Sequence, residues 1–458
     1  MVNRLTRFPK NKIFVKQRQL YKSNTIKTKI EKVIYGGSGI ATFDGIKVFV
    51  PYSAPGDVVQ AKIVEKKSNY YVAKIKKIIA PSPQRTEPPC PYFKDCGGCD
   101  LQHIKYDAQL EIKKAFALES LDRIGHITLS RPLQIISSPS FHYRNKTQYP
   151  LMNRPLKIGF YKQLSHHVVD IEHCLLHPQI FDDIRTLIKE LIIDAKEPVY
   201  NEIKHTGNLK HIQLRQGINT GEILVTYVTR TPNISEKLYA TLPQKFSRII
   251  GITQNINSEK TNRILGNKNK ILFGNDYFYE QLLDKKFKVS ANSFFQINTT
   301  QAENLVKKLR EYIGTAEQVL DLYCGVGVMS IATADLSRKI YGVEASGKAI
   351  CDALENIKLN NIGNIEYKAS PVEFAIKNYK NIDTVILDPP RKGCSESVLH
   401  DLAKLKPQTI IYISCNPTTF ARDLATLQQR NYYLEKYELI DMFPQTYHVE
   451  SIAKIIPK

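Results

Sequence analysis

The strongest constraint on the fold is an alternation of strand-like and helix-like segments between about residue 300 and residue 430. Short apolar runs bounded by turn residues alternate with amphipathic stretches of helical length. Repeated βα units of this size predict a mostly parallel sheet with helices on both faces. The expected strands are 318–323, 339–345, 365–369, 384–388 and 409–414.

The ends of these strands are the place to look for a ligand site, because open α/β sheets bind ligands beyond their carboxyl edge. The first strand carries Asp321 before a turn with Gly325 and Gly327, and the second ends in Glu344. An acid at that separation suits ribose hydroxyls. Ser330 stands where a nicotinamide site would have its third glycine. We therefore favour S-adenosylmethionine (SAM) over other nucleotides.

A cysteine, Cys415, directly follows the fifth strand, and Pro417 suits a helix start beyond it. A thiolate at a helix N-terminus is stabilised, so we expect a nucleophile, although a buried cysteine is more often an apolar filler. Asp388 ends the neighbouring strand and Arg391 follows two prolines, where amine methyltransferases tend to carry an aromatic residue. A methyl donor and a thiolate together suit methylation at pyrimidine C5, which needs thiolate addition at C6 and later removal of the C5 proton.

The C-terminal segment offers two candidates for the base that removes this proton. His448 and Glu450 both qualify chemically, and their spacing does not choose between them. A solvated surface acid is the alternative interpretation of Glu450.

Three cysteines, Cys90, Cys96 and Cys99, cluster near the N-terminus, and Cys174 lies far along the chain. Such a set suits a four-thiolate site for zinc or an iron–sulfur cluster, and the spacing alone leaves both open beside unrelated free thiols. The remaining cysteines are interpreted as packing residues: Cys324, Cys351 and Cys394.

The net charge of +21 favours a nucleic-acid partner, because basic residues that neutralise phosphates release counterions. The first 30 residues hold nine basic residues and no acidic one, although a merely solvated tail fits equally well. Residues 24–80 read as about five short strands, which suits a small barrel of the kind that binds oligonucleotides. Residues 81–91 are rich in proline and read as a linker, and 141–149 is either an RNA-holding segment or a mixed strand.

Several classes are disfavoured by composition. No apolar run approaches the roughly 18 residues of a membrane span, and no signal-peptide block opens the chain. The cytoplasm is the expected compartment, and eight cysteines in such a chain do not indicate a disulfide framework.

Taken together, these motifs resemble those of the RNA uracil-C5 methyltransferases, in the iron–sulfur, TRAM-domain branch that modifies large-subunit ribosomal RNA. The resemblance covers nearly the whole chain. The matching motifs are QIN with Gln296, DLYCGVG, GVEAS, DPPRKG, SCNPTTFARDL and FPQTYHVE.

The resemblance implies a role for each matching residue. Cys415 would attack C6, and Glu450 would remove the C5 proton. The residues implied to contact SAM are Gln296, Tyr323, Glu344 and Asp388. The residues implied to hold a [4Fe–4S] cluster are Cys90, Cys96, Cys99 and Cys174. Val328 departs from the family, where many members have an asparagine, and this puts one SAM hydrogen bond in doubt.

The implied fold is α/β: a Rossmann-like class I methyltransferase domain, an N-terminal OB-like TRAM barrel and a central α+β iron–sulfur domain. The expected boundaries are a basic tail at 1–21, the barrel at 22–80, the central domain at 81–103 with 137–290, and the methyltransferase domain at 104–136 with 291–458.

The expected function is SAM-dependent methylation of a uridine at C5 in 23S rRNA. The alternatives are the same reaction on tRNA and a catalytically silent RNA-binding or ribosome-assembly factor. RNA is the expected partner, with no membrane or protein partner implied, and a monomer is expected.

Overall fold

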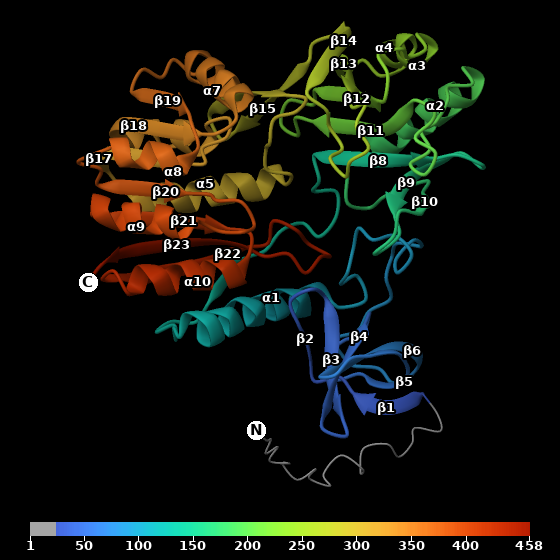
Figure 1. Ribbon diagram of the computed structural model, residues 1–458, viewed down its shortest axis with the longest axis horizontal. Coiled ribbons are helices and arrows are strands. Elements are labelled where there is room, and N and C mark those ends of the chain that lie inside the picture. The colour runs from blue at the N-terminus through green and yellow to red at the C-terminus, as the bar shows by residue number, and fades with distance from the viewer. Residues whose placement is uncertain (1–23) are drawn as a thin grey trace, which may run out of the picture. The chain divides into compact units, whose positions relative to one another are not determined.

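The computed structural model describes residues 24–458, so the expected tail at 1–21 lies outside the described residues (Figure 1). The chain separates into two compact units. Among the described residues, one unit comprises 24–34 together with Ser38–Arg85, and the other comprises Tyr35–Gly37 and Thr86–Lys458. Within the described part of the chain, no helix is long and apolar enough to cross a membrane.

The first unit is a six-stranded sheet in the order β1-β5-β6-β4-β3-β2. Only two residues separate β1 from β2, so the two ends of the sheet are consecutive pieces of chain and the sheet closes on itself. Alternating apolar side chains, among them Val48, Ala61 and Ala73, fill the interior. The strands are β1 (Thr25–Lys29), β2 (Lys32–Val33), β3 (Ser38–Phe43), β4 (Ile46–Pro51), β5 (Val58–Lys66) and β6 (Tyr70–Ala80).

The second unit contains a seven-stranded sheet in the order β10-β9-β8-β11-β12-β13-β14, with helix α2 (Gln179–Asp194) packed on it. Its strands are β8 (Lys146–Met152), β9 (Lys157–Tyr161), β10 (Val168–Asp170), β11 (Leu209–Gln216), β12 (Ile223–Thr229), β13 (Ile249–Ile256) and β14 (Lys268–Gly274). The short helices α3 (Lys237–Ala240) and α4 (Leu242–Lys245) and the hairpin β15 (Tyr277–Leu282) and β16 (Lys285–Ser290) complete this part.

The same unit contains an eight-stranded sheet in the order β19-β18-β17-β20-β21-β23-β22-β7. The five strands expected from the sequence are its parallel part. They are β17 (Ala316–Leu322), β18 (Ser337–Glu344), β19 (Ile365–Ala369), β20 (Thr384–Leu387) and β21 (Thr409–Ser414). The antiparallel β23 (Glu450–Pro457) and β22 (Tyr432–Ile440) extend the sheet, and β7 (Gln134–Ile136) ends it.

Helices cover both faces of this sheet (Figure 1). One face carries α5 (Thr299–Ile313), α6 (Val328–Ala332) and α7 (Gly347–Leu359); the other carries α8 (Val372–Ala375), α9 (Glu396–Leu405) and α10 (Pro417–Gln428). Helix α1 (Tyr106–Ser120) precedes β7 and packs against α10. Short helical turns at Leu121–Gly125, Ala334–Leu336 and Ile376–Asn378 complete the elements. Residues 106–136 therefore pack with the C-terminal sheet.

Candidate active site and cysteine cavity

A cavity of about 850 Å³ lies at the carboxyl edge of the parallel strands, facing residues of β8, β9 and β11. A volume of this size is within the range of small-molecule sites. All six residues expected at the catalytic and SAM sites line it: Gln296, Tyr323, Glu344, Asp388, Cys415 and Glu450.

One end of the cavity is built from the turn after β17. Tyr323 and Gly325 both adopt left-handed backbone, with φ of 67° and 55°. A side chain at Gly325 would point into open space, so the backbone is free for close approach by a ligand. The Gly325 N–H donates to Oε2 of Glu344, which ends β18. Glu344 thus stands beside the glycine turn, as a ribose-binding acid requires.

The other end of the cavity brings the thiol and the C-terminal acid together. Strands β21 and β23 are antiparallel, and Ser414 pairs with Ser451. Cys415 directly follows the first of these residues and Glu450 directly precedes the second. The register therefore sets the two side chains opposite each other, although they are 35 positions apart in the chain.

Burial dominates the electrostatics of this end. It raises the pKa of the Cys415 thiol to about 11, and the carboxyls of Glu450 and Asp388 add to the effect while Arg391 opposes it. In the free protein, burial therefore outweighs the stabilisation of the thiolate that is expected from the start of α10. Burial also raises the pKa of Glu450 well above its usual range, and raises that of Asp388 to about 7.

His448 does not share the position of Glu450. Burial and the nearby Arg391 lower its pKa to about 4, so the imidazole is neutral at physiological pH. Its ring packs on Phe443 and Tyr447, and Glu450, rather than His448, is among the residues that line the cavity. The geometry favours Glu450 as the group that faces Cys415.

Sequence reasoning singled out none of three further lining residues for a role in the site. Arg391 lies on the cavity wall beside the thiol, and its position just after an acidic strand end was the available signal. Lys146, within the segment 141–149, is half-buried beside Arg215, and burial lowers its pKa to about 7. Phe294 is 68% exposed and presents an aromatic face at the cavity wall.

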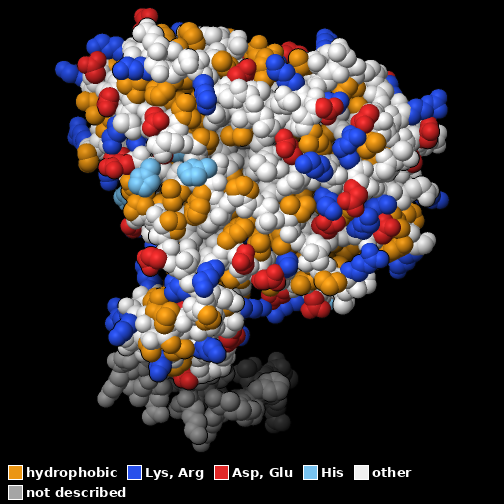
Figure 2. All heavy atoms as spheres, turned by 180° about the vertical axis from the view of Figure 1, so that it is seen from behind, with side chains coloured by type: hydrophobic (Ala, Val, Ile, Leu, Met, Phe, Trp, Pro, Cys, Tyr) orange, Lys and Arg blue, Asp and Glu red, His pale blue; other side chains and the backbone are white. Residues whose placement is uncertain are grey.

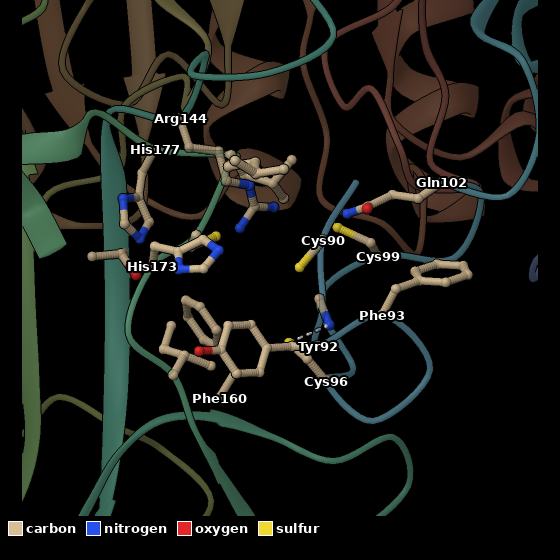
Figure 3. Close-up of a pocket in the computed structure, with 16 residues that line it drawn as sticks. Cys90, Tyr92, Phe93, Cys96, Cys99, Gln102, Arg144, Phe160, His173 and His177 are labelled. Atoms are coloured by element: carbon tan, nitrogen blue, oxygen red, sulfur yellow. Dashed lines mark hydrogen bonds between the residues drawn. The ribbon is translucent and has the colours of Figure 1, made fainter. Parts of the chain in front are cut away.

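A second cavity, of about 70 Å³, is lined by all four cysteines of the expected metal set: Cys90, Cys96, Cys99 and Cys174. Figure 3 shows Cys90, Cys96 and Cys99 on one side of this space and His173 across from them. Arg144, Thr147 and Phe160 line both this cavity and the larger one, so the two are neighbours.

Burial raises the pKa of each of the four thiols, to about 11 for Cys96 and about 12 for Cys174. The Gly98 N–H points at the sulfur of Cys96, at 3.4 Å. Among residues 24–458, no three His, Cys, Asp or Glu side chains converge as ligands of a single metal ion. A four-iron cluster binds each thiolate on a separate iron, so its ligands surround a space rather than a point. The four cysteines of this chain line one common cavity.

Comparison with known proteins places this geometry in a family. The family model described as tRNA (Uracil-5-)-methyltransferase matches residues 105–455. The chain belongs to this family. The model of the TRAM domain of tRNA (uracil(54)-C(5))-methyltransferase matches residues 26–84, which identifies the N-terminal barrel as a TRAM domain.

Relatives of this uracil-5-methyltransferase cover almost its whole length. A protein of Halalkalibacterium halodurans named as an RNA methyltransferase is 37% identical over 95% of this chain and 98% of its own. One of Clostridium acetobutylicum, also named as an RNA methyltransferase, is 39% identical over 95% of this chain and 97% of its own.

A solved structure shares the fold of the uracil-5-methyltransferase described here. It is the Pyrococcus abyssi tRNA (uracil-54, C5)-methyltransferase in complex with S-adenosyl-L-homocysteine. It has a TM-score of 0.79 and 32% identity, covering 94% of this chain and all of that one. The C-terminal sheet is thus a class I SAM methyltransferase fold, and the protein is a SAM-dependent RNA uracil-C5 methyltransferase.

Proposed function

We propose that this protein methylates C5 of a uridine in 23S rRNA, with Cys415 as the nucleophile and Glu450 as the base. The observation that carries this proposal is the register of β21 and β23, which sets the thiol opposite the carboxyl inside one cavity. We propose that the reaction takes place in the cytoplasm.

The reaction begins when the sulfur of Cys415 bonds to C6 of uracil and the C5–C6 π electrons move to form an enolate. Because the thiol of the free protein is protonated, its proton must leave as the substrate binds, and Asp388 is the nearby acceptor with a pKa of about 7. Arg391 favours the thiolate once it forms.

SAM, when bound, supplies the methyl group that C5 attacks. We assign its contacts to Gln296, Tyr323, Glu344 and Asp388, which line the cavity around the glycine turn. Glu450 then takes the proton from C5, and those electrons restore the C5–C6 bond as the sulfur of Cys415 departs from C6. Because burial raises the pKa of Glu450, this carboxyl must be ionised in the complex with SAM, where the positive sulfonium favours the carboxylate. Once ionised, a carboxylate with a raised pKa is a strong acceptor for the C5 proton.

We propose that the four cysteines hold a [4Fe–4S] cluster. Their common cavity and the N–H aimed at the sulfur of Cys96 support this assignment. Uridine methylation involves no net electron transfer, so the proposed role of the cluster is structural.

A groove continuing from the catalytic cavity supplies a path for the flanking RNA. It shares Tyr161, His211 and Ile264 with that cavity and has a volume of about 800 Å³. Exposed Lys260 and Arg263 stand on its wall. Cations and aromatic faces of this kind bind single-stranded RNA through phosphates and stacked bases.

The TRAM barrel supplies a separate basic surface, and Figure 2 shows Lys and Arg side chains spread over it. Residues 24–85 hold eleven Lys and Arg but only four Asp and Glu. Lys62 on β5 pairs directly with Lys74 on β6, and both are exposed. Like charges placed opposite each other repel, and a bound phosphate backbone would relieve that repulsion.

Two RNA classes compete as the substrate. The cysteine set and the resemblance of the motifs to the ribosomal branch support 23S rRNA. The names of the matching family model and of the Pyrococcus abyssi enzyme favour tRNA as the second candidate. The barrel does not discriminate, because it matches the TRAM domain of a tRNA enzyme.

The test uses total RNA from cells that lack the gene, incubated with SAM and either wild-type protein or Cys415→Ala. Nucleoside mass spectrometry then measures 5-methyluridine in separated rRNA and tRNA. The proposal predicts a gain in rRNA with the wild type alone. A gain only in tRNA would overturn the substrate assignment, and equal activity of Cys415→Ala would overturn the thiol mechanism.

A further inference from the structure

The segment that precedes Glu450 is hydrogen-bonded to the segment that follows Cys99. We call residues 441–449 the base loop and residues 90–104 the cysteine loop. The carbonyl of Gln445 accepts hydrogen bonds from the N–H groups of Asp100, at 2.9 Å, and Leu101, at 3.0 Å. The carboxyl of Asp100 accepts one from the Tyr447 N–H. Both contacts begin directly after Cys99.

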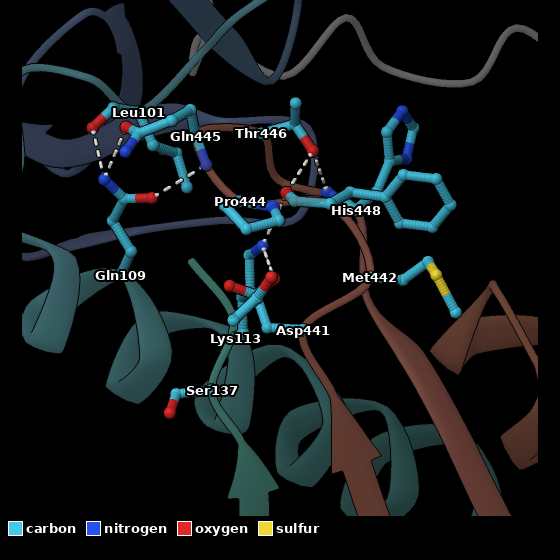
Figure 4. A network of polar contacts seen from close by, with 12 residues as sticks. Leu101, Gln109, Lys113, Ser137, Asp441, Met442, Pro444, Gln445, Thr446 and His448 are labelled. Atoms are coloured by element: carbon cyan, nitrogen blue, oxygen red, sulfur yellow. Dashed lines mark hydrogen bonds and ion pairs between the residues drawn. The ribbon is translucent and has the colours of Figure 1, made fainter. Parts of the chain in front are cut away.

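Helix α1 ties the two loops together through one buried glutamine (Figure 4). Nε2 of Gln109 donates to the carbonyls of Leu101, at 3.1 Å, and Ile104, at 2.8 Å, in the cysteine loop. One of its two N–H groups is shared with Oε1 of Gln445, which lies 2.9 Å from Nε2, while Oε1 of Gln109 accepts from the Gln445 N–H at 3.1 Å. One side chain therefore holds both loops.

The same face of α1 fixes the start of the base loop. Tyr106, Gln109 and Lys113 are three and four positions apart, which puts them on one side of the helix. The hydroxyl of Tyr106 and the ammonium of Lys113 bind opposite oxygens of Asp441, at 2.7 and 2.5 Å. Lys113 also donates to the carbonyl of Phe443. This ion pair is fully buried, so its geometry is tightly defined.

The turn that these contacts hold is strained. Gln445 is buried and has a φ of 65°, a conformation that residues other than glycine seldom adopt. Such conformations persist where the surroundings over-determine them. The carbonyl, amide N–H and side chain of Gln445 are all engaged, and the chain reaches Glu450 five residues later.

We propose that Gln109 and Gln445 are positioning residues that couple the cysteine loop to the catalytic base. In this account the order of the cysteine loop, and therefore the group bound by its cysteines, fixes the place of Glu450 opposite Cys415. The inference rests on the proposed function, in which Glu450 removes the C5 proton.

Loss of the coupling should lead to the accumulation of one specific intermediate. If Glu450 is displaced, Cys415 still adds to C6 and C5 still receives its methyl group. The C5 proton then stays in place, and the sulfur cannot leave. The result is a methylated RNA–protein adduct that survives denaturation, whereas a variant that is merely less stable loses every step together.

The main test compares Gln109→Leu with Gln254→Leu, using protein with cluster absorbance equal to that of the wild type. Gln254, on β13, is also fully buried and hydrogen-bonded, to Thr229 and Thr231. With labelled SAM and substrate RNA, we expect at least tenfold more denaturation-resistant adduct with Gln109→Leu than with Gln254→Leu. Equal adduct in both would overturn the proposal. Gln445→Ala, which keeps the backbone contacts, gives the same comparison if Gln109→Leu does not fold.

Cys99→Ser tests the cysteine side of the coupling, with the adduct fraction as its readout. We expect adduct to accumulate as in Gln109→Leu, and adduct at the wild-type level after loss of the cluster would overturn the link.

Glu450→Gln separates this inference from the proposed function. If that variant forms no adduct, the base assignment itself fails, whereas adduct in Glu450→Gln but not in Gln109→Leu rejects the coupling alone.

Discussion

Cys415 lies in an environment that favours its protonated form in the free protein. Burial and two neighbouring carboxyls favour the neutral thiol, and only Arg391 and the start of α10 oppose them. A bound sulfonium would add positive charge to the cavity and favour ionised carboxyls and thiolate. A thiol is a weaker nucleophile than a thiolate, so we expect Cys415 to react slowly in the free protein.

Asp388 illustrates a conflict between stability and ligand binding. Its pKa is raised to about 7, against about 3.9 in an unfolded chain, so the folded state keeps a proton between these values. The contribution of this proton to the free energy of unfolding is fully present below pH 4 and is lost as the pH rises through 7. We therefore expect Asp388→Asn to raise the Tm at pH 8 by about 1–2 °C, the effect of about 1 kcal/mol on a unit of this size.

The check is calorimetry of both proteins at pH 5 and pH 8 without SAM. The difference in Tm should be larger at pH 8, while titration should show weaker SAM binding by the variant. A difference that is independent of pH would mean that Asp388 is ionised throughout.

Glu344 is the residue at which the cofactor assignment is most simply tested. Glu344→Gln removes one charged hydrogen-bond acceptor, a change of about 1.5–3 kcal/mol, so SAM affinity should fall about 10–100-fold. Calorimetric titration measures the Kd, and Glu366→Gln, an exposed acid on β19, is the matched control. Unchanged affinity in Glu344→Gln would remove this residue from the site.

At the level of elements, the parallel strands were predictable and the antiparallel ones were not. The central strands β17, β20 and β21 contain short apolar runs, which their burial between two helical layers requires. The mixed sequence of β22 carried no such pattern. The closeness of Cys415 and Glu450 depends on the β21–β23 register, which is a non-local property that no local pattern encodes.

The groove beside β9 and β11 is a property of elements, because its exposed cations Lys260 and Arg263 come from the segment between β13 and β14. We expect the double variant Lys260→Ala with Arg263→Ala to weaken RNA binding and to lower the slope of log K against log salt by about 1 for each lost phosphate contact. Lys380→Ala with Lys404→Ala, two exposed lysines around a separate hollow, is the control. Equal slopes for both variants would exclude the groove as the RNA path.

For the whole molecule, the sequence indicated which chemistry was present and the structure showed which groups meet. Cys174 lies 75 positions beyond Cys99, yet both line one cavity. That convergence depends on the packing of the central strands, so spacing alone left zinc, iron–sulfur and free thiols open. The division of the second unit into central and methyltransferase domains stays a prediction.

A prediction about RNA binding by the basic N-terminal segment follows from its composition alone. Residues 2–21 contain six Lys and Arg and no acid. Deleting them should weaken RNA binding at low salt and lower the salt slope, with SAM affinity unchanged. Binding titrations over a range of salt concentrations measure this, and an unchanged slope would show that the segment does not contact RNA.

The most direct measurement of the central claim is a trapping experiment with substrate RNA that carries 5-fluorouridine. Fluorine at C5 cannot be removed as a proton, so methyl transfer should leave the RNA bound to the enzyme. Mass spectrometry of the digested complex should locate a methylated fluorouridine on Cys415, with none formed by Cys415→Ala. Methylation of normal RNA by the wild type without any such adduct would contradict the account.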